Sequence, residues 1–119
     1  MAGTDVTIYH NPRCSKSRKA LEILQQEQCD PEVVHYLDSP PDQTELKRIV
    51  ELLGLSARDL LRTTEAVYQE KNLDRNTLTD DQIIAIIVSN PVLMQRPVVV
   101  RGNQAIIGRP PEKVLEILA

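Results

Sequence analysis

The stretch that decides the fold lies near the N-terminus, where residues 5–24 read DVTIYHNPRCSKSRKALEIL. Its first residues alternate weakly between apolar and polar side chains, which predicts a strand over residues 5–9. Asn11–Pro12 is a turn signal, and behind it the apolar residues recur with helical spacing. The stretch therefore predicts a strand, a turn and a helix, with Cys14 at the point where the helix begins.

A cysteine at the start of a helix has a definite chemistry. Backbone N–H groups there are unpaired and carry partial positive charge, so they stabilise an anion. They lower the pKa of a thiol, and the thiolate is the nucleophilic form. The alternative is a small buried hydrophobe beside a solvated basic helix face. His10 stands at the end of the strand just before Cys14, and four cations add local positive charge: Arg13, Lys16, Arg18 and Lys19.

The second cysteine is not expected to react with the first. The motif is C-S-K-S rather than C-x-x-C, and Cys29 follows Cys14 by fifteen positions on what reads as the first helix segment. At about 1.5 Å per residue that separation is roughly 20 Å, whereas a disulfide needs Cα atoms within about 7 Å. Cys29 is therefore interpreted as incidental, and a covalent intermediate on Cys14 needs an outside thiol.

The remaining elements predict an α/β fold class in one domain over residues 1–119. It is a small mixed sheet with helices packed on it and a helical insertion, at about 42–90, after the second strand. The second strand should run parallel to the first in a βαβ unit. The predicted elements are a strand at 32–36, helices between Asp42 and Gly54, from Ser56 to Leu61 and from Thr79 to Asn90, a hairpin of 97–101 and 104–108, and a final helix opened by Pro110 and Pro111.

Composition excludes several classes of function. The chain has 119 residues and is 41% hydrophobic, with no Phe, no Trp and three Tyr. The core must be aliphatic, and the aromatic platforms of single-strand nucleic-acid binders are missing. A net charge of −3 argues against nucleic-acid and membrane-surface partners. No apolar run approaches the roughly 20 residues of a membrane span and no signal pattern opens the chain, so we expect a cytoplasmic protein.

Four motifs in order resemble the glutaredoxin-coupled arsenate reductases. IYHNPRCSKSRKAL, at 8–21, resembles the family's His-Asn-Pro-x-Cys loop, and GLSARDLLRTTEAVYQE, at 54–70, its Leu-Leu-Arg helix segment. NPVLMQRPVVV, at 90–100, resembles the Arg-Pro strand, and IIGRPPEKVLEIL, at 106–118, the closing Arg-Pro turn and helix. The resemblance covers nearly the whole chain, and it implies a thioredoxin-like fold with a helical insertion.

The resemblance also implies a reaction and its residues. A thiolate attacks arsenate, glutathione displaces an oxygen of the adduct, and reduction with glutaredoxin releases arsenite. No metal or bound cofactor is needed, and glutathione is a co-substrate. The Arg96–Pro97 bond matches a position where this fold commonly has a cis proline. The implied site consists of Cys14 as nucleophile, His10 and Ser17 as its catalytic partners, and Arg62, Arg96 and Arg109 as the oxyanion-binding groups.

The chain departs from the family pattern directly after the nucleophile. Family members commonly carry Gly-Thr there, and this chain has Ser15–Lys16. A side chain then stands where the backbone approaches the anion, so another oxyanion or glutathione-linked disulfides stay open as substrates. Two alternatives are a monothiol glutaredoxin-like transferase and an Spx-like regulator that binds RNA polymerase. The arginine trio favours an oxyanion site over the protein-docking site of a regulator.

Overall fold

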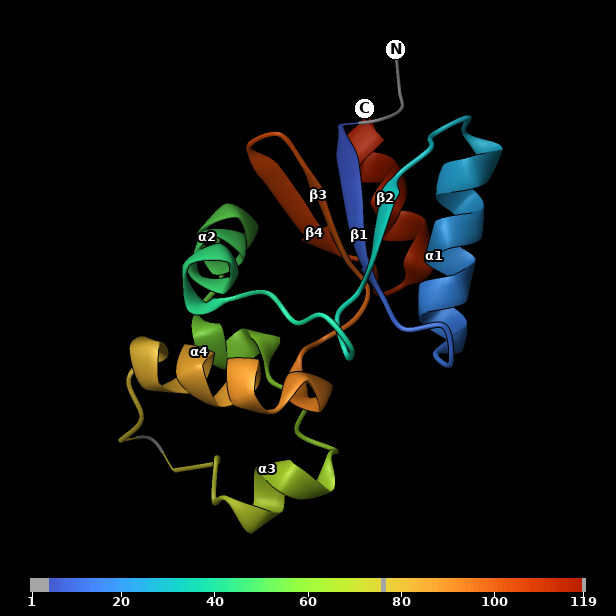
Figure 1. Cartoon of the computed structure of the whole chain (residues 1–119). Coiled ribbons are helices and arrows are strands. Elements are labelled where there is room, and N and C mark those ends of the chain that lie inside the picture. Colours follow the sequence, from blue (N-terminus) through green and yellow to red (C-terminus); the bar gives the residue numbers. More distant parts are fainter. Residues whose placement is uncertain (1–4, 76, 119) are drawn as a thin grey trace. The chain divides into compact units, whose positions relative to one another are not determined.

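The computed structural model describes residues 5–75 and 77–118, and the chain forms two compact units (Figure 1). The first unit joins the residues up to Ser39 with those from Arg96 onward, and the second comprises Pro40–Gln95. The second unit includes the insertion expected at about 42–90. The assignment of residues 1–119 to a single domain stays a prediction.

The first unit is built on a four-stranded mixed sheet in the order β2-β1-β3-β4. β1 pairs with β2 in parallel, placing His10 opposite His35, while β1 with β3 and β3 with β4 are antiparallel. This is the α/β fold class that the sequence predicts. The strands are β1 (Val6–His10), β2 (Glu32–His35), β3 (Val98–Arg101) and β4 (Gln104–Ile107).

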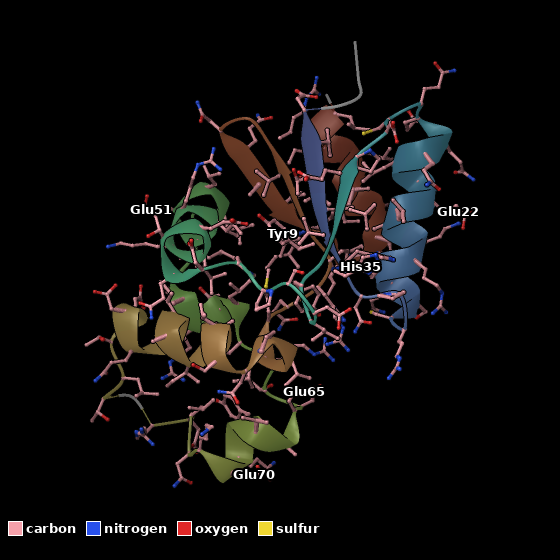
Figure 2. All side chains as sticks on the ribbon, viewed as in Figure 1. Tyr9, Glu22, His35, Glu51, Glu65 and Glu70 are labelled. Carbon is pink, nitrogen blue, oxygen red and sulfur yellow. The ribbon has the colours of Figure 1, made fainter. Side chains whose placement is uncertain are left out.

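Helix α1 (Ser15–Gln26) and the 3₁₀ helix η3 (Pro111–Leu118) pack against one face of this sheet. Alternation along β1 places Val6 and Ile8 on that face, and both are fully buried. On the opposite side of α1, Glu22 points to solvent (Figure 2), where its carboxylate lies 3.5 Å from the Lys19 ammonium. The cluster beneath this face is aliphatic, as expected, and its fully buried members are Val6, Ile8, Ala20, Leu24, Val99 and Val114.

Local end signals fix the helices of the second unit. The Asp42 carboxylate accepts the Glu45 N–H at 2.8 Å, and Thr79 and Gln82 cap each other, as the sequence predicts. Gly54 ends its helix with φ 69°, a left-handed conformation suited to glycine. The elements are α2 (Gln43–Leu53), η1 (Ala57–Leu60), α3 (Ala66–Glu70), α4 (Asp80–Ser89) and η2 (Pro91–Leu93). Of the helices in the described part of the chain, none is long and apolar enough to cross a membrane.

One expectation about Cys29 is wrong. Helix α1 ends at Gln26, and Gln28 adopts the left-handed conformation with φ 61°. The Cys29 N–H donates to the Leu24 carbonyl at 2.9 Å, so the chain leaves the helix before the cysteine. Cys29 is therefore off the first helix and packed in the core of the first unit, 3% exposed. Neither it nor Cys14 is in a disulfide.

Candidate active site

Cys14 is the N-cap residue of α1, so its side chain lies where the first N–H groups of the helix are unpaired. The turn before it is shaped by Asn11, whose carbonyl accepts the Cys14 N–H at 3.0 Å. The Asn11 side-chain oxygen accepts the Arg13 N–H, also at 3.0 Å. Asn11 is buried, so the loop is stabilised by hydrogen bonds to a residue in its interior. Asn11 was predicted only as part of a turn, and its role in bracing the loop was not predicted.

The Cys14 thiol is half-buried, and its pKa lies below the ordinary value for cysteine. Burial alone raises this pKa. Hydrogen bonds from the Ser17 N–H, the Arg96 side chain and the Lys16 N–H, together with the charge of Arg96, outweigh it and lower the pKa. The site therefore favours the thiolate, the form that acts as a nucleophile.

His10 and Ser17 form a buried pair behind this loop. The His10 Nδ1 lies 2.7 Å from the Ser17 hydroxyl oxygen, which also accepts the Asn11 N–H at 3.0 Å. Burial lowers the pKa of His10, and the charges of His35 and Arg18 lower it further. Which of Nδ1 and the hydroxyl donates in this hydrogen bond depends on the tautomer of His10. The pair links the end of β1 to the first turn of α1.

Arg96 brings a guanidinium group to the thiol from a distant part of the sequence. Its side chain hydrogen-bonds Cys14 and lies beside the buried Tyr36. Its Nε and Nη1 atoms are buried and have no hydrogen-bond partner among the described residues. A buried donor without an acceptor costs about 1–3 kcal/mol, and more when it is charged. Unsatisfied donors of this kind are explained by strain, by a catalytic role or by a bound water or ion.

Arg109 is joined to this arrangement through the backbone. Its Nε donates to the Arg96 carbonyl at 2.9 Å, so the segments before β3 and after β4 are tied together. The Arg96–Pro97 bond is cis, in the position where the thioredoxin-like fold was expected to carry one, and the Arg109–Pro110 bond is cis as well. The structure thus groups five of the six predicted site residues in the first unit: His10, Cys14, Ser17, Arg96 and Arg109.

The sixth, Arg62, belongs to the second unit. Its N–H donates to the Leu93 carbonyl at 2.7 Å, and its Nε lies 3.4 Å from the Glu65 carboxylate. The side chain is mostly buried, which argues against a purely solvated surface charge. Its contact with an oxyanion stays a prediction.

Tyr36 is a residue of the site that the sequence did not indicate. It follows β2 directly, is fully buried and lies beside the Arg96 guanidinium. Only the pairing of β2 with β1 brings it there, and no local motif marks it. Within residues 5–75 and 77–118, no group of three or more His, Cys, Asp or Glu side chains is arranged to hold a metal ion.

The lowered pKa of Cys14 predicts its alkylation behaviour. The rate with iodoacetamide should fall only as the pH drops below the native pKa, so its midpoint should lie at lower pH in the folded than in the denatured protein. Cys29, 3% exposed, should react slowly until the protein unfolds. Mass spectrometry of the two cysteine peptides measures both rates. Identical midpoints in folded and denatured protein would contradict the lowered pKa.

Gly108 lies between β4 and Arg109 and contacts the segment that follows Arg96. Its close contacts predict that a larger residue here lowers the stability of the fold. Its N–H donates to the Pro97 carbonyl at 2.9 Å, and a Cβ here would lie 2.9 Å from the Pro97 Cγ and 3.1 Å from the Val114 Cγ1. Gly108→Ala should therefore destabilise the fold by about 1–3 kcal/mol in urea unfolding. The exposed Gln104→Ala on β4 is the control, expected within about 0.5 kcal/mol of the native chain. Equal unfolding midpoints for both variants would show that the close contact is dispensable.

The order of the sheet and the place of Cys14 at the N-cap of the helix after β1 are those of the thioredoxin-like class. A search against protein-family models matches the ArsC family over residues 9–117. The chain belongs to the ArsC family.

Individual relatives agree over almost the full length. The chain is 50% identical to the uncharacterized protein YfgD of Escherichia coli (strain K12), covering 95% of this chain and 96% of YfgD. It is 44% identical to an arsenate reductase of Neisseria meningitidis serogroup A, covering 96% and 98%. Among solved structures, an arsenate reductase from Vibrio cholerae matches with a TM-score of 0.94 at 46% identity, covering 98% of this chain and 99% of that one.

Proposed function

We propose that this protein is an oxidoreductase that reduces arsenate to arsenite with Cys14 as the nucleophile. The observation that carries the proposal is the Cys14 thiol, which has a lowered pKa and lies against Arg96, two of whose nitrogens lack a protein acceptor. An arsenate oxygen supplies such an acceptor. The named arsenate reductases at 44% and 46% identity support the same substrate.

The proposed reaction proceeds in four steps. The Cys14 thiolate attacks arsenic and forms a sulfur–arsenic bond, and one protonated arsenate oxygen leaves as water. The thiol of glutathione replaces a second oxygen, and another water leaves. A glutaredoxin thiolate then attacks the glutathione sulfur, and the electron pair of the breaking bond stays on arsenic, reducing As(V) to As(III). Water hydrolyses the remaining sulfur–arsenic bond, which releases arsenite and restores Cys14.

Fixed positive charge and oriented donors favour the first step. Negative charge moves from sulfur to the arsenic-bound oxygens as the bond forms, so cations held in place lower the barrier. Planar guanidinium groups match an oxyanion with paired donors. In this proposal Arg96 and Arg109 bind the oxyanion together with Arg62, while His10 and Ser17 position the loop that carries Cys14.

The departure at Ser15–Lys16 is compatible with this reaction. The backbone N–H groups of Lys16 and Ser17 both lower the pKa of Cys14, so this stabilisation of the thiolate remains although the family's Gly-Thr is replaced. The side chains of Ser15 and Lys16 are exposed, which places them outside the packed interior. Arsenate thus remains the substrate that we propose.

Glutathione and glutaredoxin supply both electrons, so the proposed reaction uses no metal and no bound cofactor. A reducing compartment keeps these thiols available, which fits the expected cytoplasmic location.

Turnover with purified components tests the proposal. Arsenite formation should require arsenate, glutathione and glutaredoxin together, and omission of any one should abolish it. A glutathione-linked peptide disulfide should be processed no faster than in the absence of the protein. Release of glutathione from that peptide without any arsenite formation would replace this proposal with the transferase.

A further inference from the structure

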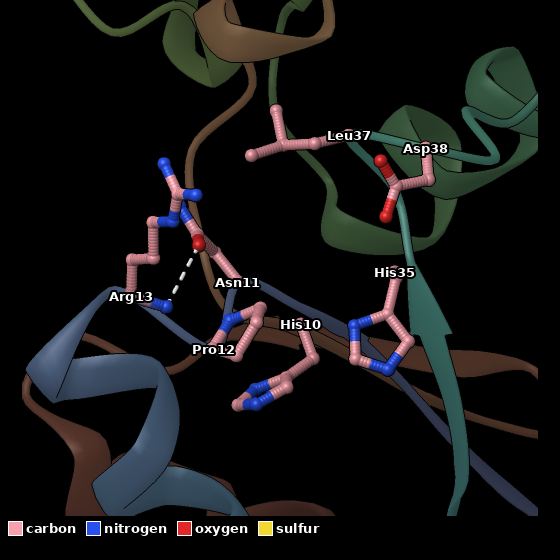
Figure 3. A pocket seen from close by; sticks show the side chains of 7 residues that line it. All are labelled: His10, Asn11, Pro12, Arg13, His35, Leu37 and Asp38. Atoms are coloured by element: carbon pink, nitrogen blue, oxygen red, sulfur yellow. Dashed lines mark hydrogen bonds between the residues drawn. The ribbon is translucent and has the colours of Figure 1, made fainter.

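A cavity lies in the first unit, directly before Cys14 in the sequence. Its volume is about 300 Å³, at the lower end of the range for small-molecule sites. One wall comes from the loop at 10–13 and the other from the segment at 35–38 that ends β2 and follows it (Figure 3). The lining residues are His10, Asn11, Pro12, Arg13, His35, Leu37 and Asp38.

Opposite charges line this cavity without neutralising each other. Arg13 reaches in from one side, while Asp38 and His35 lie on the other (Figure 3). Among the hydrogen bonds and ion pairs of the described residues, none involves the Arg13 guanidinium or the Asp38 carboxylate; only their backbone N–H groups are bonded. Leu37 adds an apolar surface that is 41% exposed. The cavity thus offers a cation, an anion and an apolar contact to one ligand.

This set of groups matches a particular chemistry. A guanidinium pairs with a carboxylate through two parallel N–H donors, and a carboxylate accepts hydrogen bonds from an ammonium group. A ligand with both a carboxylate and an ammonium group, of the size of a short peptide, satisfies both ends of the cavity. A simple oxyanion such as arsenate satisfies only Arg13 and would leave Asp38 facing a like charge.

We infer that this cavity binds the thiol co-substrate, a small peptide thiol with free carboxylate and ammonium groups, of which glutathione is the probe. Arg13 binds a carboxylate of the peptide and Asp38 binds its ammonium group, while the thiol is directed to the arsenic on Cys14. The inference rests on the proposed function, because only a thiol that attacks a Cys14 adduct needs a site here.

The distances along the chain suit this assignment. Adjacent Cα atoms are about 3.8 Å apart, and an extended tripeptide spans roughly 10 Å. A peptide held beside Arg13 is therefore long enough to bring its thiol to the neighbouring Cys14. His10 connects the cavity with the beginning of α1, because its ring lines the cavity and its Nδ1 hydrogen-bonds the Ser17 hydroxyl.

A split between the two Michaelis constants tests the inference. Arg13→Ala and Asp38→Asn should each raise the KM for glutathione by about tenfold, while the KM for arsenate stays unchanged. Both side chains are exposed, so neither change should impair folding. Lys113→Ala and Asp30→Asn remove matched exposed charges elsewhere in the first unit and should alter neither constant. Unchanged KM values for glutathione in both cavity variants would overturn the inference.

A binding measurement separates this inference from the proposed function. S-methylglutathione, whose sulfur cannot react, is titrated into Cys14→Ser protein by calorimetry. Binding should be detected and should weaken by about tenfold with Arg13→Ala or Asp38→Asn added. Absence of binding would overturn the cavity assignment even if arsenate is reduced. Binding that depends on Arg13, with no arsenite formed by the native protein, would uphold the site and overturn the arsenate reaction.

Discussion

Replacing Cys14 with serine should abolish arsenite formation, with a loss of at least about a thousandfold in kcat, as expected when a nucleophile is removed. A serine hydroxyl is not ionised near neutral pH, so the donors that stabilise the thiolate have no anion to act on. The oxygen also cannot form the sulfur–arsenic bond through which the electrons pass. Arsenite production under saturating glutathione and glutaredoxin measures the effect.

Cys29→Ala is the matched control for this prediction. Cys29 is packed in the core of the first unit and 3% exposed, so its loss should cost about 1–2 kcal/mol of stability. The kcat of the Cys29→Ala variant should stay within about twofold of the native value, which corresponds to a change of less than about 0.5 kcal/mol in the activation barrier. Full activity of Cys14→Ser, or loss of activity only in Cys29→Ala, would show that Cys14 is not the nucleophile.

Arg96→Ala should produce the second largest effect, a loss of about 10²–10³-fold in kcat, the usual result of removing a donor to developing negative charge. The same change should raise the pKa of Cys14, because the hydrogen bond and charge of Arg96 both lower it. Arg96→Lys should recover part of the pKa effect, since it restores charge without the planar pair of donors. Steady-state kinetics and the pH profile of Cys14 alkylation, measured on each variant, test the two effects together.

Arg101→Ala provides the control, because Arg101 lies on β3, the strand that Arg96 precedes. Arg101 ends β3, at the opposite end of the strand from Arg96. Its Nε lies 3.1 Å from the Asp5 carboxylate, and its Nη1 donates to the Ile117 carbonyl at 3.2 Å. Its removal should leave both kcat and the alkylation midpoint unchanged. If Arg96→Ala behaves as Arg101→Ala does, Arg96 has neither of the roles assigned to it.

Much of the framework could be predicted because its signals are local. The alternation over residues 5–9, the Asn11–Pro12 turn and the apolar spacing behind Cys14 predicted β1, the loop and α1. Side-chain caps marked the beginnings of α2 and α4 in the same way. These features depend on residues within one or two turns of each other, so no knowledge of the tertiary structure was needed.

The missed elements lacked such signals. Helix α3 has five residues and no side-chain cap, which is too short for a periodic pattern to emerge. The end of α1 was missed because Gln28, rather than glycine or asparagine, adopts the left-handed conformation there. Cys29 was placed on the helix for that reason.

Some residues of the site could be predicted from local signals and others could not. Cys14 could be singled out from its position before a helix, whereas the arginines were assigned only through the resemblance to a family. The contact of Arg96 with Cys14, and the place of Tyr36 beside it, depend on strand pairing between distant segments. The cavity between Arg13 and Asp38 depends on the same pairing, so it could not be predicted from the sequence.

Protection of Cys14 by arsenate tests most directly whether an oxyanion binds at this thiolate. The native protein is treated with iodoacetamide at neutral pH with and without arsenate, and labelling of the Cys14 peptide is followed by mass spectrometry. We predict that arsenate slows labelling in proportion to its occupancy, and that Arg96→Ala removes this protection. Labelling of the native protein at the same rate at every arsenate concentration would contradict an oxyanion site at Cys14.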